Sequence, residues 1–448
     1  MRKTKLLLRL SSLHPNFILY RYHLLDDPNT SNCMRSYLFG SPLIGLRHSH
    51  RLHHKGNPKS SYGLNSALAT RGVIAEDNVF LNLNPSELKE KGATITESLS
   101  RLPTHVRGTV AGGSSDISKA QFSKLLKQAL EFVTSHLSSM SNIFVHDGAI
   151  GSSSRCSARV RVISDSPSAV LSLSNILWNA STRSVSHDSC PVTTYAASSI
   201  SETIGSTIGL GSQTGFFAAD TERSSLILCG KAFADANGLK QSLAALSEPI
   251  IAARRGIPLA ARILELEDLV VLLFAPEDFI QSFSNQFVSA DTGVILSSQG
   301  VAPFFRTNVS NAPSLYKFPA VLILACSDSS HVLPAISKLS PGQAAYHFLA
   351  GYQNGKYIPA YNSGPSCIDP LELSKALLAK MKDTSMTPFI INISDGEKHI
   401  TEKKFVELVH STLSENIPFF RPKGKDLKVK FKRFLFSKYP ELPDEFTF

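Results

Sequence analysis

The sequence predicts a mixed α/β protein in two lobes, and two kinds of segment lead to this expectation. Short apolar runs of strand length recur along the chain. Two of them, residues 268–275 and 320–326, are continuously apolar apart from Asp268 at the start of the first, as in strands that are covered on both faces. Amphipathic segments with helical spacing alternate with these runs, the longest at about residues 117–140. A chain of 448 residues is also long enough for two or three domains with cores of their own.

The expected elements follow one another in a regular order. A turn at Asn84 to Ser86 opens the folded part and leads into a short helix. We expect strands at residues 158–164, 224–230, 268–275 and 320–326, and helices at residues 117–140, 166–178, 234–253, 371–383 and 400–414. No internal repeat is evident, so the chain is not expected to be a solenoid.

The composition is that of a folded protein with two basic ends. Hydrophobic residues make up 42% and charged residues 18% of the chain. Basic residues outnumber acidic ones by 10 to 2 in residues 1–60 and by 8 to 1 in residues 421–438, whereas residues 61–420 hold 28 against 30. The body is close to neutral, so the net charge of +10 does not indicate a nucleic-acid-binding fold. No apolar run reaches the roughly 18 residues of a membrane span, and we expect no membrane partner.

Residues 1–60 have the composition of a targeting segment. They are rich in Arg, Leu, Ser and His, and their only acidic residues are Asp26 and Asp27. This composition is typical of a mitochondrial presequence, with chloroplast import as the alternative. A disordered basic arm that binds another molecule is the other interpretation. The predicted organisation is a mitochondrial targeting segment at 1–60, a linker at 61–78, an N-terminal lobe at 79–262, a C-terminal lobe at 263–414 and a basic, aromatic tail at 415–448.

The cysteines and histidines form no metal-binding motif. The six cysteines are far apart and include no C-x-x-C pair, which predicts reduced thiols rather than a zinc site or a disulfide framework. Six of the fourteen histidines lie within residues 1–60, and no H-E-x-x-H spacing occurs in the rest.

Several segments, taken in order, carry a resemblance to one enzyme family. The most specific runs from Ala320 to Tyr352 and contains a V-L-P-x-x-S-K-L turn and a Q-x-x-Y-H-F-x-x-G-Y helix. Residues 122–164, 219–234 and 402–411 resemble further elements of the same family. Over about residues 79–412 the chain is similar to the plant-type ATP-dependent phosphoenolpyruvate carboxykinases. The resemblance implies their two-lobed fold, with a truncated nucleotide-binding lobe.

The resemblance also implies a phosphate-binding loop after residues 268–274, and there the sequence departs from the family. The segment from Ala275 to Ser282 has no glycine; Ile280 falls where the phosphate-binding lysine belongs and Gln281 where the magnesium-binding threonine belongs. Glu277 and Asp278 place negative charge where phosphates would bind. The family uses ATP, manganese and magnesium, and we expect none of these cofactors here.

The family's manganese ligands, a lysine, a histidine and an aspartate, are mostly absent as well. Their positions fall on Asn237 or Gly238, on Ala260 and on Asp291. The resemblance therefore leaves Asp291 as the one candidate metal ligand. One oxygen ligand of three holds a transition metal weakly, and the alternative for Asp291 is a turn residue.

Two residues are candidates for binding the family's substrate. Arg107 is the one arginine near the position of the substrate arginine, and it needs a four-residue deletion to fit. Tyr195 resembles a tyrosine that touches the carboxylate or carbon dioxide side of the substrate, with a buried packing tyrosine as the alternative.

Three functions are compatible with this sequence. The first is a phosphoenolpyruvate carboxykinase-like protein without catalytic activity, which acts as a binding or structural factor in mitochondria with an unknown protein partner. The second is residual ATP-dependent activity that converts oxaloacetate to phosphoenolpyruvate in gluconeogenesis. The third is an RNA- or ribosome-associated factor, because residues 421–438 interleave basic residues with Phe431, Phe434 and Phe436, and Tyr439 follows directly. For this tail the alternative is an amphipathic helix that closes the core.

Overall fold

The computed structural model describes most of the chain after residue 61. The described residues are 62–107, 119–199, 214–266, 268–281, 288–290, 293–307, 312–330, 332–395, 398–413, 416–421 and 426–448. They belong to one compact unit that extends from His53 to Phe448. The expected targeting segment lies outside the described residues. No described helix is both long and apolar enough to span a bilayer.

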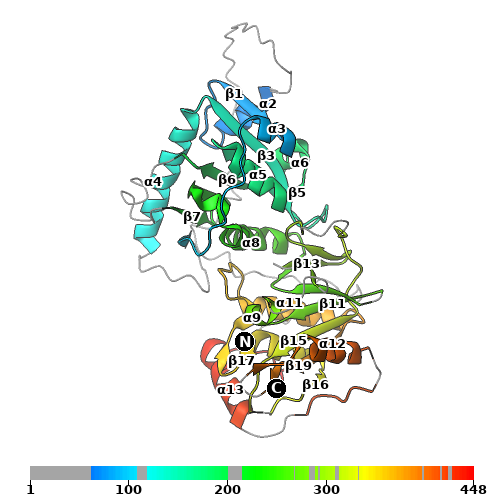
Figure 1. Cartoon of the computed structure of the whole chain (residues 1–448). Helices are drawn as coiled ribbons and strands as arrows, with labels where there is room; N and C mark the ends of the chain where they lie inside the picture. Colours follow the sequence, from blue (N-terminus) through cyan, green and yellow to red (C-terminus); the bar gives the residue numbers. More distant parts are fainter. Residues whose placement is uncertain are drawn as a thin grey trace, which may run out of the picture. The chain divides into compact units, whose positions relative to one another are not determined.

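An eight-stranded mixed sheet forms the centre of the N-terminal lobe (Figure 1). Its strands, in spatial order, are β1 (Asn78–Leu81), β3 (Asn142–Ile150), β4 (Ala158–Ser164), β6 (Val192–Ala197), β8 (Ser225–Gly230), β7 (Gly215–Asp220) and β2 (Thr104–Arg107), with β5 (Trp178–Asn179) beside β3. Strands β4, β6 and β8 run parallel, whereas β3 and β7 are antiparallel to their neighbours β4 and β8.

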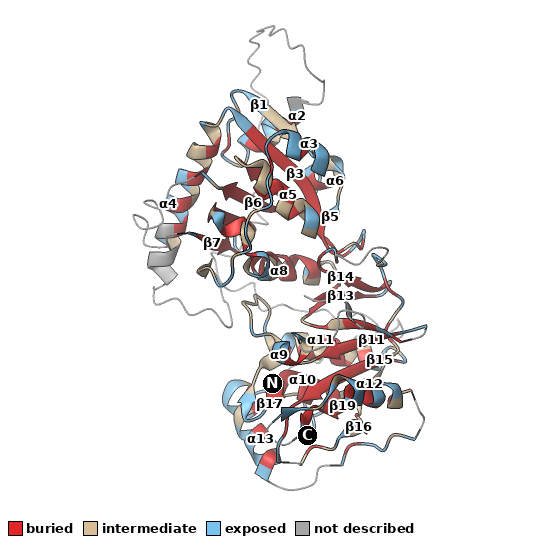
Figure 2. Cartoon of the chain, in the orientation of Figure 1, coloured by how far each residue is buried: buried red, intermediate tan, exposed pale blue. Residues whose placement is uncertain are grey.

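Helices cover both faces of this sheet. One face packs against α2 (Tyr62–Ala69) and α4 (Lys119–Ser138). The other face packs against α3 (Pro85–Glu90), α5 (Pro167–Ile176) and α8 (Ala236–Ala253). Because both faces are covered, the central strands are buried throughout, as Figure 2 shows. The short helix α6 (Thr182–Ser186) follows β5.

A six-stranded sheet forms the centre of the C-terminal lobe. Its order is β12 (Val288–Ala290), β10 (Arg262–Leu266), β11 (Leu269–Phe274), β15 (Val321–Cys326), β19 (Thr387–Asn392) and β16 (Ile336–Lys338). The three central strands β11, β15 and β19 are parallel. Helices α10 (Pro341–Ala350), α11 (Pro370–Lys382) and α13 (Asp426–Lys438) pack on one face, and α9 (Glu277–Gln281) and α12 (Glu402–Ser411) pack on the other.

A small antiparallel sheet contributes to the cores of both lobes. It consists of β9 (Ile257–Leu259), β13 (Val294–Ser297) and β14 (Gly300–Pro303). Side chains alternate along β13, so that Ile295 joins the N-terminal core while Val294 and Leu296 join the C-terminal core. The remaining elements are β17 (Tyr352–Gln353), β18 (Lys356–Tyr357), β20 (Ser394–Asp395), β21 (Lys398–His399) and the 3-10 turns Lys231–Ala234 and Pro359–Tyr361.

Local signals in the sequence explain where α10 begins and ends. The Ser340 hydroxyl accepts a hydrogen bond from the Gln343 amide at 3.2 Å, and the Gln343 side chain accepts one from the Ser340 amide at 3.1 Å. This capping box satisfies amides that have no partner within the helix, and Pro341 suits the first helical position. Gly351 ends the helix at φ 55°, a conformation that favours glycine.

The mixed α/β class predicted from the sequence is confirmed, and most expected elements lie within a few residues of their observed bounds. One segment differs from the expected organisation, and in the tail the structure agrees with the alternative of a helix that closes the core. Residues 62–69, expected within a linker, form α2, whose Leu64 and Leu68 are buried one helical turn apart. The tail after residue 414 contains α13, whose Phe431 and Leu435 are buried in the core of the C-terminal lobe.

Candidate functional site

The carboxyl ends of β11, β15 and β19 meet at one edge of the C-terminal sheet. Ligands of open α/β sheets bind at this edge, beyond the ends of parallel strands. Three segments of this chain leave the strands there, at residues 275–281, 327–333 and 393–399. They are the place where the family resemblance predicts nucleotide chemistry.

The segment after β11 folds as the short helix α9, and its centre is a buried aromatic side chain. Phe279 is fully buried, and its ring lies 5.2 Å from the ring of Phe405 and 5.4 Å from that of His399, edge to face in both cases. Ile280 is partly buried against the same apolar cluster. The apolar side chains of Phe279 and Ile280 therefore pack into the core beside α12.

The two acidic residues of α9 pair with neighbouring basic residues. A carboxylate oxygen of Glu277 accepts a hydrogen bond from the guanidinium of Arg262. A carboxylate oxygen of Asp278 lies 3.2 Å from Nε2 of His399. Both carboxylates remain largely exposed, at 58% and 73%.

The residues after β11 do not fit the phosphates of a nucleoside triphosphate. Pro276 has no N–H to offer a phosphate, and residues 275–281 contain no lysine. Phe279 packs inward, and the side chains outside it are the carboxylates of Glu277 and Asp278, which repel phosphate oxygens.

The turn after β15 is organised by one buried carboxylate. Asp328 is 1% exposed and accepts hydrogen bonds from the amides of Ser330 (3.0 Å), Val332 (3.0 Å) and Leu333 (2.9 Å), and from the Ser330 hydroxyl (2.5 Å). These four hydrogen-bond donors compensate the buried carboxylate for its lost contacts with water. The V-L-P turn singled out in the sequence is thus held from inside by Asp328.

A second buried residue ties this turn to β19. The side-chain oxygen of Asn392 accepts hydrogen bonds from the amides of Asp328 (3.0 Å) and Ser394 (3.1 Å). Its side-chain nitrogen donates to the carbonyls of Asp328 (2.9 Å) and Leu333 (3.4 Å). Because the polar atoms of Asp328 and Asn392 are engaged with the chain itself, these residues hold the turn in place.

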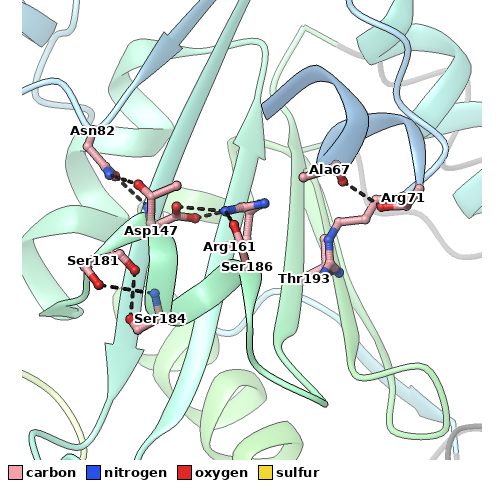
Figure 3. A network of polar contacts seen from close by, with 11 residues as sticks. Ala67, Arg71, Asn82, Asp147, Arg161, Ser181, Ser184, Ser186 and Thr193 are labelled. Atoms are coloured by element: carbon pink, nitrogen blue, oxygen red, sulfur yellow. Dashed lines mark hydrogen bonds and ion pairs between the residues drawn. The ribbon is translucent and has the colours of Figure 1, made fainter. Parts of the chain in front are cut away.

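A buried ion pair lies within the N-terminal sheet, across β3 and β4 (Figure 3). The guanidinium of Arg161 donates to both carboxylate oxygens of Asp147, at 2.7 and 2.9 Å, and to the hydroxyl of Ser186 at 3.0 Å. Both charged side chains are at most 1% exposed. Asn82 accepts from the Asp147 amide at 2.7 Å, which ties the loop after β1 to this pair.

The structure places the two candidate substrate residues apart. Tyr195 lies on β6, is 5% exposed, and donates its hydroxyl to the carbonyl of Arg71 at 2.9 Å beneath α2. Burial raises its pKa, against the smaller opposite effects of Arg71 and Arg223. Arg107 lies on β2, three strands from β6, which is roughly 14 Å at ordinary strand spacing. The sheet does not bring Arg107 and Tyr195 together.

Two of the three positions of the family's metal ligands lie within the described residues, and neither carries a charged side chain. Asn237 is exposed in the first turn of α8, and the neutral Ala260 follows β9. Asp291 lies outside the described residues. Within the described ranges, no group of three His, Cys, Asp or Glu residues is placed to bind a metal ion.

Sequence reasoning missed one further polar cluster, at the carboxyl ends of β4 and β6. Asp165 accepts hydrogen bonds from the amides of Ser198 and Ser199 and from their hydroxyls, and lies 3.0 Å from Nε2 of His136. Burial acts to raise the pKa of Asp165, but these hydrogen bonds together lower it below the usual value. The signal for Asp165, as for Asp328, is an acidic residue one or two positions after a buried strand.

Comparison with known proteins adds sequence evidence to this geometry. The family model described as phosphoenolpyruvate carboxykinase matches residues 293–356, which run from β13 to β18 and include the Asp328 turn. Curated relatives named phosphoenolpyruvate carboxykinase (ATP) include those of Christiangramia forsetii, 31% identical over 103 residues, Flavobacterium johnsoniae, 35% over 88, and Bacillus cytotoxicus, 40% over 63.

These matches are partial in both directions. They cover 20%, 16% and 14% of this chain, and 19%, 16% and 12% of the respective relatives. The matched region nevertheless includes the turn and helix that carry the family resemblance, and the mixed α/β architecture agrees with a carboxykinase-like fold. Over this matched region the chain is similar to the ATP-dependent phosphoenolpyruvate carboxykinases, and it spans less than one fifth of the length of these curated relatives.

Proposed function

We propose that this chain is a phosphoenolpyruvate carboxykinase-like protein that has lost carboxykinase activity and acts as a binding or structural factor. One observation carries the proposal: α9 stands where the family's phosphate loop belongs, and its Phe279 is packed between Phe405 and His399. Phosphoryl transfer depends on a glycine-rich loop whose amides bind the phosphates and on a lysine that neutralises their charge. Residues 275–281 contain neither a glycine nor a lysine.

Two buried polar networks support a role that depends on the folded structure. The polar networks around Asp328 and around the Asp147–Arg161 pair are complete within the chain. Both stabilise strands and turns instead of presenting charge to a substrate. A protein selected for a folded surface keeps such networks when it no longer needs catalytic charges.

A coupled assay tests the proposal. The full chain is incubated with oxaloacetate, ATP, manganese and magnesium, and phosphoenolpyruvate is measured, with the Flavobacterium johnsoniae relative as positive control. We expect no product above the background of buffer alone. Product that is lost when ATP is omitted would instead establish the second function, residual carboxykinase activity.

We also propose that the protein acts in mitochondria, on the basis of the basic composition of residues 1–60. A fluorescent protein fused after residue 60 should colocalise with a mitochondrial dye. Fluorescence in chloroplasts would support the alternative organelle, and fluorescence throughout the cytosol would contradict a targeting role.

A further inference from the structure

Helix α13 has one face in the core and another that is exposed and strongly basic. Its buried residues are Leu427, Phe431 and Leu435, spaced four residues apart. Figure 2 shows exposed segments along the same helix. The exposed cations are Lys428, Lys430, Lys432, Arg433 and Lys438. With Asp426 as the one acidic residue, the helix carries a net charge of five minus one, or +4.

None of these five cations forms an ion pair within the described part of the chain. Lys432 and Lys438 instead lie over aromatic rings, 5.5 Å from the ring centre of Phe436 and 5.2 Å from that of Phe434. The positive charge of this face is therefore available to an anionic partner.

Two apolar side chains lie in the middle of the basic face. Val429 is 53% exposed and Phe436 is 50% exposed. They are seven residues apart, which at 3.6 residues per turn places them almost on one line along the helix. By the same geometry Lys428 and Lys432 lie to one side of this line, and Lys430 and Arg433 to the other. Apolar groups thus form the centre of the face and cations form both flanks.

This arrangement fits the surface of an anionic bilayer. Apolar side chains on the centre line enter the boundary between headgroups and acyl chains, while lysine and arginine reach sideways to lipid phosphates. Each basic residue near such a surface contributes about a factor of five in affinity. We propose that the exposed face of α13 docks this protein onto a membrane surface rich in anionic phospholipid.

Nucleic acid fits the same face less well. Single-stranded RNA needs rings free to stack on bases, and Phe431 is fully buried while Phe434 is already stacked on Tyr357, with ring centres 4.0 Å apart. Phe436 remains, but Lys432 lies over its ring. The exposed Val429 has no ring that could stack on a base. The proposal departs from the expectation of no membrane partner, because a surface contact requires no spanning segment.

Vesicle sedimentation with the full chain tests the proposal. The vesicles contain phosphatidylcholine alone or with about one third phosphatidylglycerol, a share that gives a clearly negative surface. We expect binding to the anionic vesicles only. The double variant Lys432→Gln/Arg433→Gln should weaken it about twenty-five-fold, two factors of about five. Val429→Ser/Phe436→Ser should weaken it at least tenfold, because exposed apolar area is lost.

A matched control separates this face from general basicity. Lys403→Gln/Lys404→Gln removes two adjacent exposed lysines from α12, and we expect vesicle binding within a factor of two of the unmodified chain. Circular dichroism confirms that each variant is folded. Vesicle binding that both α13 variants leave unchanged, binding weakened equally by the α12 control, or retention on single-stranded RNA without retention on anionic vesicles would overturn the proposal.

Discussion

The ring of Phe279 packs edge to face against the ring of Phe405, with their centres 5.2 Å apart. This contact joins α9 to α12 across the edge of the sheet where parallel strands β11, β15 and β19 end. An aromatic contact in this position makes the segment after β11 part of the core. The Phe279 ring therefore links the stability of the C-terminal lobe to the shape of this edge.

Removing the Phe279 ring should unfold the chain more easily. Phe279→Ala leaves a cavity beneath α12, and we expect the free energy of unfolding to fall by about 3–5 kcal/mol in a urea titration. Gln281→Ala, on the exposed side of the same short helix, serves as control and should change it by about 0.5 kcal/mol or less. Equal stability of Phe279→Ala and the unmodified chain would show that the ring is not packed.

The Asp328 carboxylate should hold the V-L-P turn. Asp328→Ala leaves four donors without their acceptor, and we expect a loss of about 2–4 kcal/mol. Amide hydrogen exchange should speed up at Ser330, Val332 and Leu333. Asp383→Ala, at an exposed helix end, is the matched control, and a similar loss there would argue against a specific role for Asp328.

The Asp147–Arg161 pair should be costly to break and nearly neutral to replace. Asp147→Leu leaves a buried guanidinium without its carboxylate, and we expect a loss of about 3–5 kcal/mol of unfolding free energy. The double variant Asp147→Leu/Arg161→Met should recover most of that loss. Additive losses in this double-mutant cycle would mean that the two side chains do not interact.

His347 should make the folded state sensitive to acid. Burial lowers the pKa of His347 to about 3, so the unfolded chain, with a histidine pKa of about 6.5, binds a proton that the folded chain does not. Stability should therefore fall as the pH drops below about 6.5, by about 2 kcal/mol between pH 7 and pH 5 from this group.

A pair of variants isolates the contribution of His347. His347→Leu should flatten the dependence of unfolding free energy on pH over this range. His410→Gln, at an exposed position of α12, should leave that dependence as it is. An unchanged profile in His347→Leu would show that His347 is not buried in its neutral form.

The sequence predicts strands best where every residue of the strand is buried. Strands such as 158–164 and 320–326 were predicted nearly to the residue, because sheets covered on both faces require unbroken apolar runs. Residues 62–69, expected within a linker, have only Leu64 and Leu68 as fully buried residues among the described side chains of α2. A short helix contains too few apolar residues for their helical spacing to be recognised in the sequence.

The polar networks could not be predicted from the sequence in the same way. Asp147 and Arg161 meet only because β3 and β4 pair in one particular register, which sequence pattern alone does not determine. For the tail, an RNA-binding surface and a core-packing helix share the same alternation of basic and aromatic residues. Only the packing shows which rings belong to the core: Phe431 is buried, whereas Phe436 is half exposed.

We propose that this carboxykinase-like chain does not bind ATP in the manner that the family resemblance implies. Isothermal titration calorimetry of the full chain with ATP and manganese tests it most directly, with the Flavobacterium johnsoniae relative as positive control. We predict no saturable heat from this chain at millimolar ATP. Saturable binding in the micromolar range, retained in Lys403→Gln/Lys404→Gln, would contradict the account.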